Sequence, residues 1–181
     1  EVRDAVDAVE MPAISGRVEL RGVDFSYRGD TRVLHDVDLH VAPGQTVALV
    51  GPTGAGKTSI ANLIARFYDA TEGGVEIDGL DVRAVTQRSL REQMGLVPQD
   101  PFLFPGTIAD NVRFGRPDAG DGEVEEAARL ANAHEFILAL PGGYHTEILE
   151  GGDNLSVGQR QLICIARAVL ADPRILILDE A

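Results

Sequence analysis

The feature that most constrains this chain is a glycine-rich octapeptide, Gly51–Thr58 (GPTGAGKT), which matches G-x-x-x-x-G-K-[ST]. An apolar run, Thr46–Val50, precedes it. The segment that follows has the apolar spacing of an amphipathic helix, at Ile60, Leu63, Ile64 and Phe67. The sequence therefore predicts a buried strand, a glycine loop and a helix in succession, which is the context in which this octapeptide binds phosphate.

Each residue type in the octapeptide has a physical role in holding a polyphosphate. Glycines let successive backbone N–H groups point into one concavity, and the N-terminus of the next helix adds N–H groups and a positive dipole end. Lys57 would give a point charge to the β- and γ-phosphates, and the Thr58 hydroxyl would ligate Mg²⁺. We predict phosphate contacts along the whole loop and the first helical turn: Gly51, Pro52, Thr53, Gly54, Ala55, Gly56, Lys57, Thr58 and Ser59.

A second motif lies at the end of the chain, where the apolar run Ile175–Leu178 is followed by Asp179 and Glu180. The run predicts a buried strand that delivers two acids at its carboxyl end, the edge at which open parallel sheets bind ligands. Asp179 would hold Mg²⁺, and Glu180 would act as general base on an attacking water. Alone, this pattern is also typical of a buried strand ending in solvated acids.

A third motif is the segment Leu155–Gln159 (LSVGQ). Ser156 and Gln159 have the S-x-x-Q spacing of a capping box, which predicts a helix start. A capped helix start that carries a glycine, here Gly158, is also an anion site. Both interpretations can hold together.

Composition narrows the possible partners. With 29 acidic residues against 16 Lys and Arg, the net charge is −13, so the surface repels nucleic-acid phosphates and anionic lipid headgroups. We therefore expect no nucleic-acid partner. A single cysteine, Cys164, excludes an intrachain disulfide and is expected in the core. No apolar run reaches the roughly 18 residues that cross a bilayer, so we expect no membrane insertion by these residues.

The remaining pattern divides the chain into segments. Residues 1–16 alternate acids with Val and Ala, and a frayed linker is expected. Period-two alternation between about Val18 and Val41 predicts an antiparallel layer on the flank of the domain. Val75 and Ile77, followed by Asp78-Gly79, predict a short strand and turn. The middle, about residues 83–165, is predicted to be a mostly helical subdomain.

These three motifs, in this order, resemble the nucleotide-binding domains of ABC transporters. Leu155–Gln159 resembles that family's signature, with Val157 where Gly is usual. The resemblance implies an α/β fold: a P-loop NTPase (RecA-like) core with an antiparallel β flank and a helical subdomain. It also implies ATP and Mg²⁺ as ligands. A second such domain would pair head to tail, with Leu155, Ser156, Val157, Gly158 and Gln159 facing the partner's nucleotide.

The same resemblance gives roles to further residues. Tyr27 resembles the aromatic residue on which adenine stacks, although it could be an ordinary strand tyrosine. Gln99 resembles the glutamine that touches Mg²⁺ and the attacking water. The implied catalytic set is then Lys57, Gln99 and Glu180, and the implied metal ligands are Thr58, Gln99 and Asp179. The stretch Asp100–Gly115 resembles the surface that meets membrane helices, with an apolar patch at Phe102, Leu103 and Phe104.

The resemblance runs from about Val18 to the end and stops there, before the family's switch histidine. It implies that residues 17–181 are a C-terminally incomplete ATP-binding domain, inactive alone, and that residues 1–16 link it to an upstream membrane domain. The expected place is the cytoplasmic face of the cell membrane. Two alternatives stay open: a soluble ABC-family ATPase and a non-hydrolytic ATP-binding regulatory module. Homodimer and heterodimer are equally compatible with the sequence.

Overall fold

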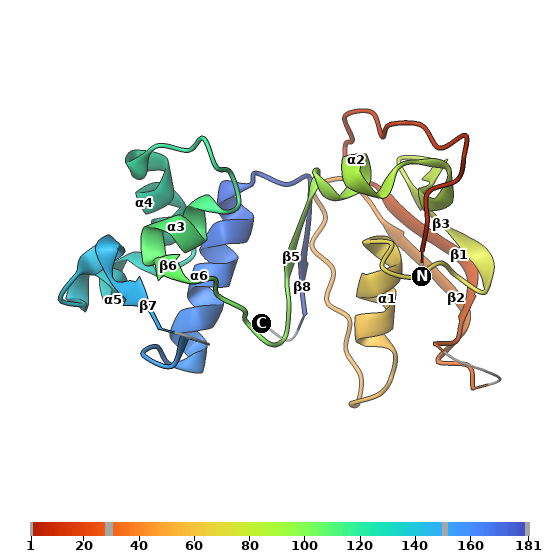
Figure 1. Cartoon of the computed structure of the whole chain (residues 1–181). Coiled ribbons are helices and arrows are strands. Elements are labelled where there is room, and N and C mark those ends of the chain that lie inside the picture. The colour runs from red at the N-terminus through yellow and green to blue at the C-terminus, as the bar shows by residue number, and fades with distance from the viewer. Residues whose placement is uncertain (1, 28–30, 150–151, 180–181) are drawn as a thin grey trace. The chain divides into compact units, whose positions relative to one another are not determined.

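A computed structural model describes residues 2–27, 31–149 and 152–179. The chain divides into two compact units, Glu1–Met94 and Gly95–Ala181, which are described separately (Figure 1). The glycine loop lies in the first unit. Gln99, the Leu155–Gln159 segment and Asp179 lie in the second.

Unit 1 is built on a four-stranded antiparallel sheet in the order β2-β1-β3-β4. Its strands are β1 (Val18–Phe25), β2 (Leu34–Val41), β3 (Glu72–Ile77) and β4 (Leu80–Asp81). The alternating apolar residues of β1 are buried, as period-two patterning requires. The predicted antiparallel flank is therefore confirmed.

The turn between β3 and β4 is a two-residue hairpin loop at Asp78-Gly79. Ile77 and Leu80 pair across it, and both loop residues have positive φ, 51° at Asp78 and 85° at Gly79. Positive φ at both central positions is the geometry that Asp-Gly favours in tight hairpins. The predicted turn is confirmed.

One helix, α1 (Lys57–Ile64), begins directly at the glycine loop. It is shorter than the apolar stripe predicted, because the chain leaves the helix at Ala65 and Arg66 adopts a φ of 52°. Phe67 therefore lies outside the helix, with its ring 4.5 Å below the Arg91 guanidinium. The short 3-10 helix η1 (Val82–Ala84) and α2 (Gln87–Arg91) complete the unit.

The strand predicted at Thr46–Val50 is not formed. No described segment makes a ladder with it, and Val47, Leu49 and Val50 are 40%, 39% and 93% exposed. An apolar run specifies a tendency to be buried, whereas a strand also needs a hydrogen-bonded neighbour. The prediction was wrong because this second requirement cannot be read from the run itself.

The segment 2–16, here called the N-terminal strap, is ordered against unit 1 rather than frayed. Met11 and Ile14 are buried. Val9 forms an isolated parallel bridge with Val85, with Val9 N–H donating to Ala84 O at 3.0 Å. The expectation of fraying was wrong. Apolar residues that show no periodicity can still be buried when the backbone around them is hydrogen-bonded to the rest of the unit.

Unit 2 is mostly helical. Its helices are α3 (Ile108–Arg113), α4 (Asp121–Leu130), α5 (His134–Ala139), η2 (Gly143–His145) and α6 (Val157–Leu170). Its strands are β5 (Met94–Val97), β6 (Gly106–Thr107), β7 (Glu147–Ile148) and β8 (Ile175–Leu178). Residues 83–165, predicted as a mostly helical subdomain, contain α2 to α5, η2 and the start of α6 together with β5, β6 and β7, and they run across the boundary between the two units.

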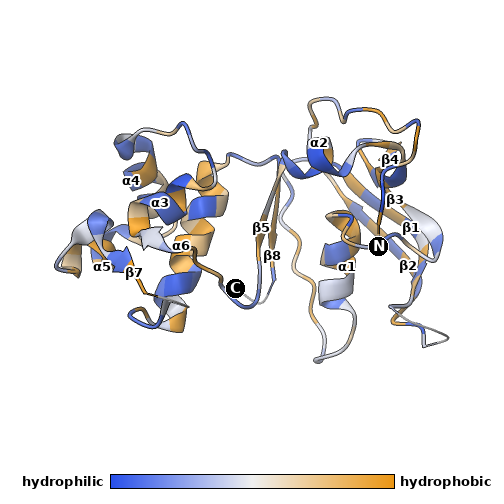
Figure 2. Ribbon diagram, viewed as in Figure 1, coloured by the Kyte–Doolittle hydropathy of each residue, from blue (hydrophilic) through white to orange (hydrophobic). Residues whose placement is uncertain are grey.

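The core of unit 2 lies where α3 and α4 pack on α6. Figure 2 shows apolar and polar residues sharing α6, as in an amphipathic helix. Cys164 is buried in this core as predicted, and burial raises the pKa of its thiol. β8 pairs with β5, but Leu176 and Leu178 are 45% and 51% exposed, so this strand is not buried on both faces as predicted.

Candidate functional site

The glycine loop of unit 1 has a backbone that only glycine permits at two positions. Gly54 and Gly56 have φ of 83° and 93°, and Gly56 is the N-cap residue of α1. A Cβ added at Gly56 would also lie 2.5 Å from Leu34 Cδ2. Backbone conformation and close packing therefore both require glycine directly before the helix, and the loop enters α1 with no side chain at its cap.

Lys57 sits at the start of α1 with its ammonium group folded over the loop. Its Nζ donates to the carbonyl oxygens of Gly51, at 2.9 Å, and Pro52, at 3.0 Å. Lys57 is also the one lysine in the sequence. In a chain with a net charge of −13, this is a local cation held beside a helix N-terminus, and the donor set fits a polyphosphate.

Tyr27 and Ser59, both predicted to contact nucleotide, are brought together in unit 1. Tyr27 follows β1, is 44% exposed, and its hydroxyl forms a 2.9 Å hydrogen bond with the Ser59 Oγ. Ser59 is buried on the first turn of α1. The ring of Tyr68 lies 5.0 Å from that of Tyr27. Tyr68 was not among the predicted site residues. The feature that could have indicated it is the aromatic pair Phe67-Tyr68, directly after the helix.

The predicted metal ligands are divided between the units. Thr58 is exposed on the first turn of α1 in unit 1, whereas Gln99 and Asp179 belong to unit 2. Asp179 N–H donates to Val97 O at 3.0 Å, so Gln99 and Asp179 follow neighbouring strands, β5 and β8. Glu180 lies outside the described residues.

Within the described ranges, no three or more His, Cys, Asp or Glu side chains form a metal-binding cluster. The oxygen donors that are present, a hydroxyl, an amide and one carboxylate, are of the kind that Mg²⁺ takes together with phosphate oxygens and water. Each of these groups, taken by itself, is a donor type that fits Mg²⁺.

The Leu155–Gln159 segment forms the start of α6 with the predicted capping box. Ser156 Oγ accepts from Gln159 N–H at 3.2 Å, and Gln159 Oε1 accepts from Ser156 N–H at 2.9 Å. Leu155 is buried and anchors the turn, whereas Val157 is 60% exposed and Gly158 would have open space around an added Cβ. The helix start therefore presents Ser156 and Gly158 at the surface.

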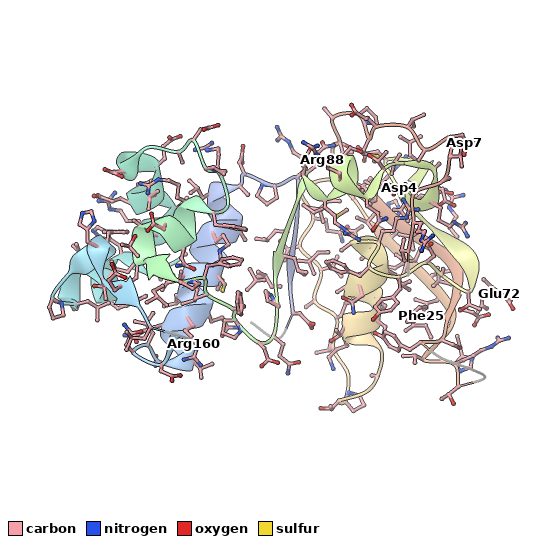
Figure 3. All side chains as sticks on the ribbon, in the orientation of Figure 1. Asp4, Asp7, Phe25, Glu72, Arg88 and Arg160 are labelled. Carbon is pink, nitrogen blue, oxygen red and sulfur yellow. The ribbon has the colours of Figure 1, made fainter. Side chains whose placement is uncertain are left out.

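Arg160 holds the loop before this helix. Its Nη1 donates to Leu155 O at 2.8 Å and to Gly152 O at 3.2 Å, and it is labelled on α6 in Figure 3. These bonds fix the approach of the chain to the capping box. The exposed helix start is therefore tied to the preceding loop by hydrogen bonds.

An aromatic surface on unit 2 consists of Phe102, Phe104 and Phe114. Phe102 and Phe114 are each 60% exposed, and the rings of Phe104 and Phe114 stack with centroids 4.4 Å apart. The Arg167 guanidinium lies 5.2 Å from the Phe104 ring. The predicted patch of Phe102, Leu103 and Phe104 was wrong for Leu103, which is buried in the core. Phe114, at the end of α3, belongs to the surface in its place.

Comparison with known proteins identifies the family. The family profile described as "ABC transporter" matches residues 34–181. An uncharacterized ABC transporter ATP-binding protein of Bacillus subtilis, YfiC, is 53% identical over 181 residues. A fatty acid ABC transporter ATP-binding/permease protein of Mycobacterium bovis is 51% identical over 172 residues, or 95% of this chain.

A solved structure supports the same family assignment. The structure of a bacterial Atm1-family ABC exporter with ATP bound aligns over 99% of this chain with a TM-score of 0.95 and 46% identity. The chain spans 30% of the Bacillus protein, 27% of the Mycobacterium protein and 32% of the exporter chain.

Among the described residues, none of the helices combines the length and the apolar character needed to cross a bilayer. The match covers the glycine loop, the capped start of α6 and the strand before Asp179. This chain therefore belongs to the ABC transporter family, as an ATP-binding domain related to those of exporter-type transporters.

Proposed function

We propose that residues 17–181 bind Mg-ATP and power an exporter-type transporter, with hydrolysis completed only in the whole protein. The observation that carries the proposal is the glycine loop, in which left-handed Gly54 and Gly56 lead into α1 beside the folded-back Lys57 ammonium. Such a loop presents backbone donors, a helix N-terminus and a cation to one anionic group.

The remaining contacts with nucleotide follow from residue chemistry. Tyr27, exposed next to the loop, would stack on adenine, and Ser59 would meet the phosphates as part of the first turn of α1, with its hydroxyl bonded to Tyr27. Thr58, Gln99 and Asp179 would ligate Mg²⁺, which neutralises charge on the phosphates when bound. Glu180 would accept the proton of the attacking water, oriented by Gln99.

A second ABC domain is the proposed partner. The exposed start of α6 offers Ser156 and Gly158 to an anion, and the sequence contains no second G-x-x-x-x-G-K-[ST] motif to supply one. Nucleotide held on the partner's glycine loop would fill this place. Val157 is 60% exposed, so its departure from the usual Gly is compatible with that contact.

A transmembrane domain, joined through residues 1–16, is the second proposed partner, with this domain at the cytoplasmic face of the membrane. The exposed aromatic surface Phe102, Phe104 and Phe114 is suited to meet helices from such a domain. This apolar surface and the strong negative charge favour a transporter over a soluble ABC-family ATPase acting on nucleic acid.

Two variants test the proposal in the full-length protein. Lys57→Ala should abolish ATP binding measured by calorimetry, because it removes the one cation at the loop, whereas Arg88→Ala, an exposed cation of unit 1, should not. Glu180→Gln should keep ATP binding, slow phosphate release severely and accumulate a dimer by light scattering. Normal turnover in Glu180→Gln would remove the general-base role.

A further inference from the structure

Tyr27 does not project freely from the end of β1, since three side chains of unit 1 hold it. Its hydroxyl is bonded to Ser59 Oγ at 2.9 Å. The ring of Phe25 lies 4.7 Å away at 77°, and that of Tyr68 lies 5.0 Å away at 89°. Contacts at near-perpendicular angles from two rings, with a hydrogen bond at the tip, restrict both the plane and the direction of the Tyr27 ring.

The backbone that carries Tyr68 is itself tied to β1. Thr71 N–H donates to Asp24 O at 2.9 Å, and Ser26 N–H donates to Thr71 Oγ1 at 3.2 Å. These two hydrogen bonds connect the segment after α1 to the residues just before Tyr27. Phe25, labelled in Figure 3, is 2% exposed and closes the base of the cluster.

Tyr68 differs from Phe25 in its surroundings. It is 42% exposed, similar to Tyr27, and the Phe25 ring lies 5.6 Å from it. A half-exposed ring in edge contact with another half-exposed ring contributes little to a hydrophobic core. What it does contribute is a fixed orientation for its neighbour.

We propose that Tyr68 is a positioning residue for the nucleobase: its ring, together with the Tyr27–Ser59 hydrogen bond, fixes Tyr27 so that a base can stack on it. The inference rests on the proposed nucleotide binding and adds to it. Ordering the aromatic ring before the ligand arrives lowers the cost of ordering it on binding. The effect should therefore be seen for ligands that carry a base and be absent for polyphosphate alone.

The test compares two probes, Mg-ATP and inorganic tripolyphosphate with Mg²⁺, by calorimetry on the full chain. Tyr68→Leu should weaken ATP binding about fivefold and leave tripolyphosphate binding unchanged, because an aromatic pair contact is lost away from the phosphates. Tyr68→Phe keeps the ring and should restore ATP affinity. Tyr27→Leu should weaken ATP about tenfold by loss of stacking.

Two further variants separate positioning from packing. In a Tyr27→Leu background, Tyr68→Leu should change ATP affinity less than about twofold, since the ring it orients is gone. Tyr27→Phe keeps the ring but loses the Ser59 bond, and should weaken ATP about threefold with tripolyphosphate unchanged. This variant leaves Tyr68 intact, so it tests the cluster even where Tyr68→Leu fails to fold.

The outcomes are distinct. Equal losses for ATP and tripolyphosphate in Tyr68→Leu, or additive losses in the double variant, would overturn the positioning role and leave the proposed function standing. Failure of the unmodified chain to bind either probe would overturn the proposed function itself. A base-dependent loss that Tyr68→Phe restores would support the inference.

Discussion

Both units have an apolar core, and they differ in the polar side chains that are buried with it. Of the four buried polar side chains in the described ranges, Asp24, Ser59 and Arg66 lie in unit 1 and Asn111 lies in unit 2. Arg66 is 1% exposed and donates to Val85 O at 2.5 Å, Asp4 Oδ1 at 3.3 Å and Arg3 O at 3.2 Å. One buried guanidinium therefore fastens the N-terminal strap to the end of α1.

The core of unit 2 is a continuous apolar cluster. Val97, Ile108, Val112, Ile137 and Ile163 are 0% exposed, and the cluster joins α3, α4, α5 and α6. Its buried Asn111 is satisfied by the backbone of Phe104 and Thr107. Apolar burial is non-directional, whereas a buried guanidinium stabilises only one arrangement of its partners. Unit 1 therefore adds a buried, directional contact to its apolar core, at the place where the N-terminal strap meets α1.

The largest expected effect concerns the apolar cluster. Ile163→Ala removes a fully buried side chain from the middle of α6 and should cost about 2–5 kcal/mol of unfolding free energy. Amide hydrogen exchange should rise in α3, α4 and α6 and stay unchanged in the strap. Leu138→Ala, 57% exposed on α5, is the matched control and should cost less than about 0.5 kcal/mol. If Ile163→Ala raised amide hydrogen exchange equally in both units, the apolar cluster would not be specific to unit 2.

The next effect concerns the buried guanidinium. Arg66→Met keeps much of the volume but leaves the buried Val85 carbonyl oxygen without this donor, and should cost about 1–3 kcal/mol. It also removes the ion pairs with the partly exposed Asp4 and Asp69. Exchange should rise across residues 2–16 and remain low in α6. Arg88→Met is the control, because Arg88 is exposed and pairs with Glu92 across one helical turn. A strap that keeps its protection in Arg66→Met would show that apolar contacts at Met11 and Ile14 suffice.

The smallest effect is a pH dependence confined to unit 1. Burial tends to raise the pKa of Asp78, but hydrogen bonds from Ser15 N–H, Ser15 Oγ and Arg17 N–H outweigh it and hold that pKa below its ordinary value. A carboxyl with a lowered folded-state pKa stabilises the fold above about pH 4, and this contribution is lost as the pH falls through the lowered value.

Asp78→Asn should accordingly flatten the fall of the urea midpoint of unit 1 below about pH 4. Asp118→Asn, an exposed carboxylate of unit 2, serves as the control and should leave the profile unchanged. An unaltered acid profile in Asp78→Asn would mean that the strap end is held by its buried Ile14 rather than by this carboxylate.

Several parts of the site could be predicted because their contacts lie within a few residues of one another. The Ser156–Gln159 capping box and the Asp78-Gly79 hairpin are both local. Such features follow from residue type and spacing, since the backbone geometry between the partners is nearly fixed. The prediction of a strand at Thr46–Val50 was wrong for the opposite reason, because a strand forms only when its backbone pairs with a segment elsewhere in the chain.

The local motifs of this protein can be read from its residue types and spacing: a glycine loop with one lysine, a capped helix start, and an apolar run before acids. The tertiary structure decided which distant groups meet. Tyr27 and Ser59 are 32 residues apart, and Arg66 reaches Asp4 across 62 residues. Periodicity and local propensity do not specify such pairs. The chain must turn back between the two residues, and many different turns are compatible with the same pattern of apolar and polar residues. Only the folded sheet, with β1 paired to β3, brings Tyr68 beside Tyr27.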